Sequence, residues 1–343
     1  MTMKMPSWNR RRFLQISSLS GLFTLLHSQA RGAMFFMKKL LSRSPRETHP
    51  VTPTSEFYVY DVGRMSRMIE DLDYSEWVLN VKGRVKNPLG LTQETIRERP
   101  IVRLTSTIEC IENPVGGTSI GNAVWGGVRL GDLLTEAGAD SRAKKVIFRA
   151  ADGYSDSIPL ERAMDTPVLL AYEMNGEPLP RSHGFPLRAV VPGIYGMKQV
   201  KWIMEIEVSD EDYQGYWQQR GWSDEATVRT MSRIDSPGPY QELRGPEHEI
   251  RGVAFAGSKG IEKVEVSTDG GLSWNTARLD DPLSPHCWVI WRYTWTVKKP
   301  GVHRIVVRAT NGKGNVQTSE EEAAYPDGTT GLHAIVVDNI LEG

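Results

Sequence analysis

The sequence predicts an α+β domain followed by a β-sandwich domain. Between residues 56 and 234, short strand-like and helical runs are mixed without a regular alternation, which favours α+β over a doubly wound sheet. After about Arg233, strand-like runs recur about every ten residues with turn residues between them, a spacing typical of a β-sandwich. The 343 residues are enough for two separate cores. A proline–glycine segment at 235–239 is the expected hinge between them.

In the first part, each expected element follows from its residue pattern. Residues 77–85 alternate apolar and polar side chains up to a turn at Asn87-Pro88, and the run 145–150 is closed by Asp152-Gly153, so both are predicted strands. Residues 102–108 form a further strand-like run. Residues 128–134 have apolar side chains at helical spacing and stop before Gly138, which predicts a helix. We expect these elements to form one domain over residues 56–234.

The second part consists of strands and tight turns. Strand-like runs are expected at 250–257, 288–297 and 302–309. A further run at 264–268 leads into Asp269-Gly270-Gly271, which is a strong turn signal. The pattern predicts an immunoglobulin-like sandwich over residues 240–343, and nothing in its composition indicates catalysis.

The N-terminus has the order of an export signal. Arg10–Arg12 precede a short apolar stretch at 16–26, and small residues at 28–30 suit cleavage. The apolar stretch is too short and too interrupted for a membrane span. The arginines followed by Phe13-Leu14 resemble a twin-arginine signal, so residues 1–30 are the expected leader and the periplasm is the expected location. The alternative is a basic patch on a disordered terminus. Residues 31–55, rich in Arg, Ser and Pro, are the expected linker.

The charge balance and the cysteine count exclude some classes of function. Lys and Arg total 41 against 42 Asp and Glu, so a nucleic-acid-binding surface spread over the whole protein is not expected. Two cysteines are too few for a disulfide framework, and no C-x-x-C pair indicates a zinc site. Cys287 is expected to be structural. A disulfide between Cys110 and Cys287 is permitted in an exported protein but is not favoured.

Cys110 is the candidate catalytic residue. It ends the strand-like run 102–108, and Asn113-Pro114 and Gly116-Gly117 force a loop after it, which is where catalytic residues tend to be presented. A thiolate is also a suitable ligand for a soft transition metal. The alternative, which the local chemistry alone favours, is a small buried hydrophobic side chain.

A longer set of motifs favours the metal. From about Phe57 to about Gln317 the sequence resembles the sulfite oxidase family. The motifs that carry the resemblance are Cys110 itself and residues 120–130 (IGNAVWGGVRL), 170–180 (LAYEMNGEPLP), 183–188 (HGFPLR), 191–193 (VPG) and 200–202 (VKW), in that order. The resemblance implies a molybdopterin-binding α+β domain in which Cys110 binds molybdenum and a pterin dithiolene supplies two more sulfurs.

The same resemblance implies which residues hold the cofactor. His183, Arg188 and the segment Gln199, Val200 and Lys201 match positions that contact the pterin and its phosphate. An arginine fork and a lysine charge are apt partners for a phosphate dianion. Asp152 is a further candidate. The alternatives are a turn role for His183 and Asp152 and a solvated surface charge for Lys201.

The sequence departs from the sulfite-oxidising pattern around the metal. No arginine occurs at 111–115, and Tyr60 and Trp222 stand where an anion-binding arginine and a catalytic tyrosine are expected. Burial of the sulfite dianion without paired cations is unfavourable. The nearest replacement cations are Lys198, Lys201 and Arg220. Tyr60 and Trp222, together with Trp125, are expected to wall a more neutral pocket.

The function expected from the resemblance is two-electron oxygen-atom transfer, with oxidation of sulfite to sulfate as the leading reaction. Reduction of a sulfoxide or another organic substrate at the same cofactor is the alternative, and a catalytically inactive exported binding protein is a second one. No haem motif is visible in the chain, so a separate electron-transfer partner, a cytochrome or a membrane redox protein, is expected. Residues 252–257 and 264–271 resemble the dimerisation module of the family, which implies a homodimer.

Overall fold

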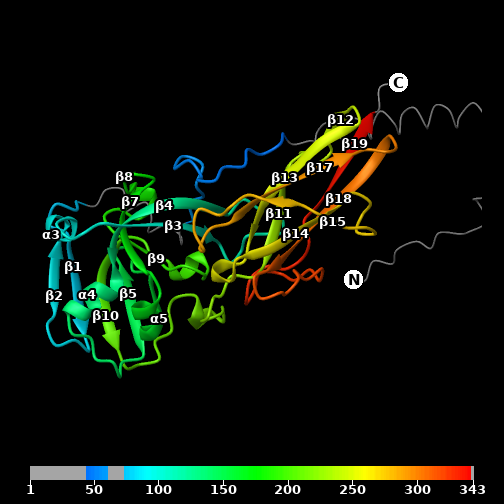
Figure 1. Cartoon of the computed structure of the whole chain (residues 1–343). Coiled ribbons are helices and arrows are strands. Elements are labelled where there is room, and N and C mark those ends of the chain that lie inside the picture. Colours follow the sequence, from blue (N-terminus) through cyan, green and yellow to red (C-terminus); the bar gives the residue numbers. More distant parts are fainter. Residues whose placement is uncertain (1–43, 61–72, 341–343) are drawn as a thin grey trace, which may run out of the picture.

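The computed structural model describes residues 44–60 and 73–340, and within them the chain is mostly β-sheet. The two domains lie end to end along the long direction of the molecule (Figure 1). The expected leader, residues 1–30, and the linker residues 31–43 lie outside the described part. None of the helices in the described part is long and apolar enough to cross a bilayer.

The first domain contains two sheets. One has the strand order β2-β1-β10-β5-β6, with β1 and β10 parallel and the other pairs antiparallel. Its strands are β1 (Val78–Gly83), β2 (Leu89–Thr92), β5 (Lys145–Ala150), β6 (Ser155–Pro159) and β10 (Ile203–Ser209). The other has the order β3-β4-β7-β8, with β9 paired to β7. Its strands are β3 (Val102–Glu109), β4 (Ile120–Arg129), β7 (Leu169–Met174), β8 (Glu177–Pro178) and β9 (Arg188–Val190).

Short helices connect these strands. The α-helices are α3 (Gln93–Arg97), α4 (Leu130–Glu136) and α5 (Leu160–Asp165), and the 3-10 helices are η3 (Arg181–His183), η4 (Gly196–Lys198) and η5 (Gln218–Arg220). The predicted strands at 102–108 and 145–150 are confirmed. The helix predicted at 128–134 begins two residues later, because Val128 and Arg129 still pair with β7.

The second domain consists of two sheets that face each other. One has the order β11-β13-β17-β16 and the other β12-β19-β18-β14-β15. A single apolar core, which includes Trp291 from the first sheet and Val307 from the second, fills the space between them. The elements are β11 (Met231–Ser236), β12 (Glu242–Arg244), β13 (Glu247–Phe255), η6 (Gly257–Lys259), β14 (Ile261–Ser267), β15 (Asn275–Thr276), β16 (Arg278–Leu279), β17 (Val289–Thr296), β18 (Gly301–Asn311) and β19 (Ala334–Ile340).

The junction between the domains differs from the expected hinge. Strand β11 begins at Met231 and pairs with β13, so the second domain's first sheet starts before the proline–glycine segment at 235–239. Residues 44–55, the described end of the expected linker, are held by hydrogen bonds to both domains. The backbone N–H of Arg46 donates to Asp235 O (2.8 Å), and that of Thr52 donates to Asn122 O (2.7 Å).

The two domains share an apolar interface. One buried cluster contains Ile111 and Tyr195 of the first domain together with Phe255 and Trp288 of the second. The backbone N–H of Trp288 also donates to Thr107 Oγ1 (2.9 Å). This packing fixes the end of β3, and therefore the loop that follows it, against the second domain.

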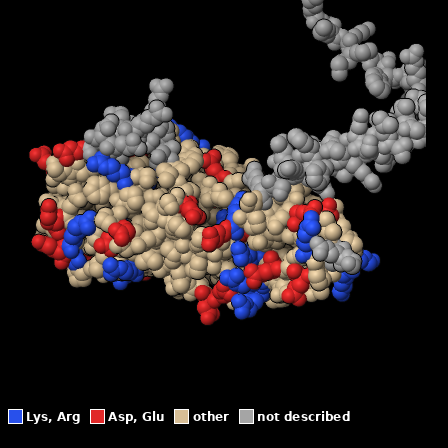
Figure 2. Space-filling model, turned by 90° about the horizontal axis from the view of Figure 1, so that it is seen from above, with Lys and Arg blue, Asp and Glu red and all other residues tan. Residues whose placement is uncertain are grey.

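The sequence made predictions about the two cysteines and about the surface charges. Cys110 and Cys287 are both free, so they do not form a disulfide. Cys287 is buried, with its sulfur 3.2 Å from Ser284 Oγ, as expected for a structural cysteine. On the face seen from above, basic and acidic side chains are interspersed, and the described part of this face carries no patch of a single sign (Figure 2).

Candidate functional site

A pocket in the first domain brings together the residues that the sequence predicted as catalytic or cofactor-binding. Its empty volume is about 870 Å³, part of which is open solvent. Such a volume suits a cofactor or a small ligand. The predicted residues that line it are Tyr60, Cys110, Asp152, His183, Arg188, Gln199, Val200, Lys201 and Trp222.

Cys110 lies on the pocket wall directly after β3. Its N–H donates to Ser119 O (2.9 Å), and its carbonyl accepts from the N–H of Asn113 (3.0 Å), so the loop backbone fixes the position of the thiol. Burial, reinforced by the charges of Glu112 and Glu109, raises the pKa of Cys110 to about 11. The free thiol is therefore protonated at neutral pH, and a bound cation is needed to stabilise the thiolate.

Arg188, the first residue of β9, is a buried cation in the same pocket. Its side chain is 5% exposed, and burial lowers its pKa to about 10. The guanidinium donates to His183 O (2.9 Å) and, with a longer contact, to Gln199 O (3.5 Å), and it lies over the Trp125 ring at 4.8 Å. Among the described residues, no carboxylate forms an ion pair with it. A buried arginine without a counter-ion favours an anionic ligand.

The other predicted cofactor residues surround Arg188. The side chain of Gln199 is bonded to backbone, to Val191 N–H (3.2 Å) and Ile194 O (3.0 Å), so this glutamine shapes the pocket through its main chain. Val200 is buried beside it. Lys201 donates to Ser182 O (3.1 Å) and keeps its side chain at the pocket edge.

Two of the open alternatives involved turns. Asp152 Oδ1 accepts the N–H of Tyr154 (2.9 Å), which is a turn contact, and Asp152 also lines the pocket. His183 ends the 3-10 helix η3, is 4% exposed and packs edge-on against Phe57 with ring centroids 5.6 Å apart. Both residues therefore have a turn position and a place on the pocket wall.

Tyr60 lies at the exposed side of the pocket, next to an acidic residue. Its hydroxyl donates to Glu112 Oε2 (2.7 Å). Burial and this hydrogen bond raise the pKa of Tyr60 to about 12. Tyr58 lines the pocket further in, and its hydroxyl lies so near Gly196 that a Cβ there would be only 3.0 Å away. In the stretch 111–115, where the family pattern has an arginine, Glu112 therefore presents a carboxylate to the pocket.

An aromatic wall closes another side. Trp217 and Trp222 pack edge-to-face with ring centroids 6.0 Å apart, and both line the pocket. The prediction that Trp125 belongs to this wall is wrong. Trp125 is fully buried, donates to Ser106 O (3.2 Å) and lies behind Arg188, so it supports the pocket without lining it.

The three candidate replacement cations differ in position. Lys198 is 2% exposed and ion-paired with Asp156 and Asp224, away from the pocket lining. Arg220 is exposed and stacks on Tyr216, also outside the lining. Of the three, Lys201 alone lines the pocket, and it lies on the Arg188 side.

Several lining residues were not predicted as site residues. They include Tyr58, Glu112, Tyr154, Met197 and Trp217. A signal existed for Tyr58, because in an extended segment residues 58 and 60 lie on the same face. Tyr154 reaches the site through a contact with Met197 O (2.6 Å), 43 residues along the chain, which no local pattern reveals.

The donor set fits a metal that carries its own ligands. In the part of the chain that the structure describes, no group of three or more His, Cys, Asp or Glu side chains could hold a metal ion. A metal at Cys110 therefore needs further ligands from a cofactor, and the buried Arg188 provides a charge for an anionic part of it. A molybdenum-pterin, with its dithiolene sulfurs and phosphate, meets both conditions.

Comparison with known proteins gives matches for both domains. Residues 66–217 match the model of the oxidoreductase molybdopterin binding domain, and residues 220–325 match that of the Mo-co oxidoreductase dimerisation domain. Sulfite oxidase of Arabidopsis thaliana is 32% identical, over 82% of this chain and 86% of the relative. Mitochondrial sulfite oxidase of Homo sapiens is 33% identical over 78% of this chain, which spans 57% of that relative.

A solved structure resembles the fold. The sulfane dehydrogenase SoxCD from Paracoccus pantotrophus matches with a TM-score of 0.68 and 26% identity, over 77% of this chain and 76% of that chain.

Proposed function

This chain belongs to the sulfite oxidase family of molybdopterin-dependent oxidoreductases, and we propose that it catalyses two-electron oxygen-atom transfer at sulfur in the pocket around Cys110. The observation that carries the proposal is that one pocket contains both a fixed thiol and a buried arginine that forms no ion pair within the described chain. These are the two protein groups that a metal-bearing, anionic cofactor requires.

In this proposal Cys110 holds the metal, and His183, Arg188 and Lys201 hold the pterin and its phosphate. The bound molybdenum-pterin supplies the two-electron and oxygen-atom chemistry. The chain contributes binding and shape. Gln199, Val200 and Asp152 line the pocket that would hold the cofactor, and the aromatic wall would limit the access of water.

The leading reaction is the oxidation of sulfite to sulfate, which the family relationship supports. A second candidate, the reduction of a neutral organic sulfoxide, is favoured by the lining itself. Glu112 presents a carboxylate, and Tyr60 and Trp222 present aromatic surface, where sulfite would need cations. Repulsion between like charges at low dielectric disfavours a dianion there. In this second case Tyr60 and Trp222 contact the substrate.

Steady-state assays on protein produced in a host that makes the pterin test the proposal. Turnover of sulfite with a dye acceptor supports the leading reaction, and turnover of a sulfoxide with a reduced dye supports the second. Failure of both, with stoichiometric molybdenum bound, contradicts the proposal. Cys110→Ser is expected to lose the molybdenum–thiolate absorption and turnover together, and a spectrum identical to that of the wild type excludes Cys110 as the ligand.

Location and partners extend the proposal. We propose that residues 1–30 direct export by the twin-arginine route to the periplasm, and that a cytochrome or a membrane redox protein exchanges electrons with the site, since the sequence shows no haem motif. We also propose that the second domain is an immunoglobulin-like sandwich through which two chains form a homodimer; its match to a dimerisation domain supports this. Fractionation of cells that express an Arg10→Lys/Arg11→Lys variant tests the route, because the variant should remain in the cytoplasm.

A further inference from the structure

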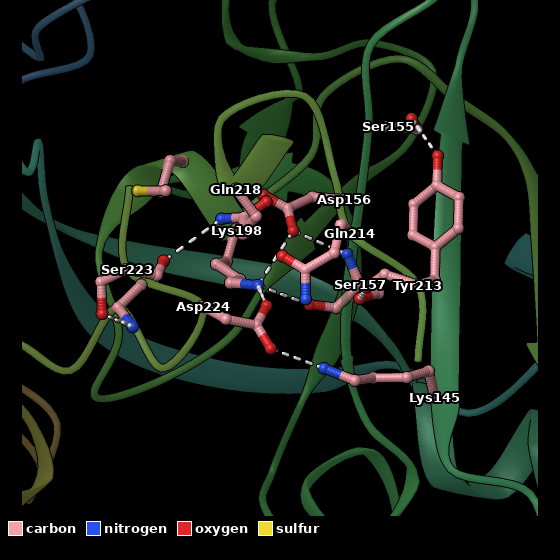
Figure 3. Close-up of polar contacts among 12 residues, drawn as sticks. Lys145, Ser155, Asp156, Ser157, Lys198, Tyr213, Gln214, Gln218, Ser223 and Asp224 are labelled. Atoms are coloured by element: carbon pink, nitrogen blue, oxygen red, sulfur yellow. Dashed lines mark hydrogen bonds and ion pairs between the residues drawn. The ribbon is translucent and has the colours of Figure 1, made fainter. Parts of the chain in front are cut away.

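A group of four charged side chains, three of them buried and the fourth, Asp224, partly exposed, lies behind the pocket. Lys198 Nζ is 3.0 Å from Asp156 Oδ1 and 2.6 Å from Asp224 Oδ1, and it also donates to Ser157 O (Figure 3). The second Asp224 oxygen accepts from Lys145 Nζ at 2.7 Å. Lys198 is 2% exposed and Asp156 is fully buried. The two cations and two carboxylates balance in charge, and Lys145 also pairs with the exposed Asp212 at 3.6 Å.

The group joins elements that are distant in the sequence. Lys198 belongs to η4, Asp156 to β6 and Lys145 to β5, whereas Asp224 follows Trp222 in the loop after β10. The loop therefore has its C-terminal end fixed to η4 by the contact between Lys198 and Asp224.

The N-terminal end of the same loop has different anchors. The Tyr213 hydroxyl is 2.7 Å from Ser155 Oγ, and Tyr213 O accepts from Ser157 Oγ (3.1 Å). Residues 213–224, which we term the wall loop, thus attach at one end through Tyr213 and at the other through Asp224. Trp217 and Trp222 lie between these anchors and form the pocket wall.

The front of the network touches the pocket directly. The Tyr154 hydroxyl lies 2.6 Å from Met197 O and 3.2 Å from Asp156 Oδ2, and both Tyr154 and Met197 line the pocket. An ion pair with two defined partners restricts geometry more than apolar packing does, whereas its contribution to stability is often small after desolvation. The arrangement is therefore better suited to fixing a position than to adding stability.

We propose that Lys198 is a positioning residue that holds the wall loop against η4 and so sets the substrate side of the pocket through Trp217 and Trp222. The inference rests on the proposed function only in that this pocket takes the substrate. Because its ammonium group is already bound to two carboxylates, Lys198 does not serve as a substrate-anion ligand.

Hydrogen exchange of the molybdenum-loaded protein tests, without a substrate, whether the contact between Lys198 and Asp224 holds the wall loop; we call this contact the tether. Lys198→Met is expected to speed exchange in the wall loop at least tenfold, while β3 exchanges as in the wild type. Asp224→Asn should give the same local change, and because Asp224 is partly exposed, this substitution should not prevent folding. Since both changes cut one tether, the double variant should exchange no faster than the faster single variant. Unchanged exchange in the wall loop of Asp224→Asn overturns the proposal.

Kinetics separate positioning from a general structural role. With whichever substrate the wild type turns over, Lys198→Met should raise KM several-fold with kcat and bound molybdenum near wild-type values. Arg308→Met, which breaks a partly buried pair with Glu265 in the second domain, is the control and should change neither KM nor wall-loop exchange. A parallel fall of molybdenum content and kcat in Lys198→Met also overturns the proposal. If the wild type turns over nothing, the proposed function fails while the exchange result still decides the tether.

Discussion

Replacement of Arg188 by methionine should leave the cofactor-free protein as stable as the wild type and remove its ability to retain molybdenum. The pKa of Arg188 falls from 12.5 to about 10 because the side chain is buried, which corresponds to about 3 kcal/mol of unfavourable burial. Against this stand one good hydrogen bond and two long ones to backbone carbonyls, about 1–2 kcal/mol together, and the contact with the Trp125 ring, about 1–2 kcal/mol. The net change is expected to be within about 1 kcal/mol.

A second buried arginine provides the matched control. Arg233 is also 5% exposed, but its Nε lies 2.6 Å from Asp235 Oδ1, so Arg233→Met leaves a buried carboxylate without its partner. That change should cost about 3–5 kcal/mol. Urea denaturation of the cofactor-free proteins measures both effects, and elemental analysis of protein from a pterin-producing host measures retention. A loss above about 2 kcal/mol in Arg188→Met, or full molybdenum content, would refute an anion-binding role for Arg188.

Two further predictions concern charge. The pKa of His333 is lowered from 6.5 to about 4 by burial and by Arg46 and Arg233, and its neutral ring accepts from Ile234 N–H (2.9 Å). The neutral ring contributes about 3 kcal/mol to the free energy of unfolding above pH 6.5, and this contribution is lost as the pH falls towards 4. Urea denaturation over this pH range should show the loss in the wild type and a smaller loss in His333→Asn. Glu112→Gln should raise kcat/KM for sulfite about tenfold, equivalent to about 1.4 kcal/mol, and leave that for a neutral sulfoxide unchanged; equal changes for both substrates would contradict a charge effect.

Local patterns predicted the strands well and the domain junction less well. The runs at 102–108 and 145–150 became β3 and β5 because strand-forming residues and the turn residues that follow them act locally. The hinge was expected at 235–239 because of its prolines and glycine. The chain nevertheless enters the second domain's sheet at Met231, since pairing of β11 with β13 depends on a partner about 20 residues away and not on turn chemistry.

The candidate site was predicted through ordered motifs, and its electrostatics were not. Tyr60, Cys110 and Trp222 lie on one pocket although 162 positions separate the first from the last. The sequence indicates Lys198 as a candidate anion ligand because it is a lysine close to the motif at 200–202. Its partners Asp156 and Asp224 lie 42 and 26 residues away, so only the folded chain shows that its charge is already compensated.

The pocket wall depends on the second domain as well as on Lys198. The Trp222 ring packs edge-to-face on Tyr325, with centroids 5.3 Å apart, and Ser223 N–H donates to Pro326 O (3.2 Å). The wall loop is therefore held from behind by the ion network and from the side by a segment of the domain that matches a dimerisation module. A shift of that domain moves the packing partner of Trp222 directly, whereas Arg188 has its anchors in the first domain. Domain packing should consequently affect substrate access through Trp222 before it affects the hold of Arg188 on an anionic ligand.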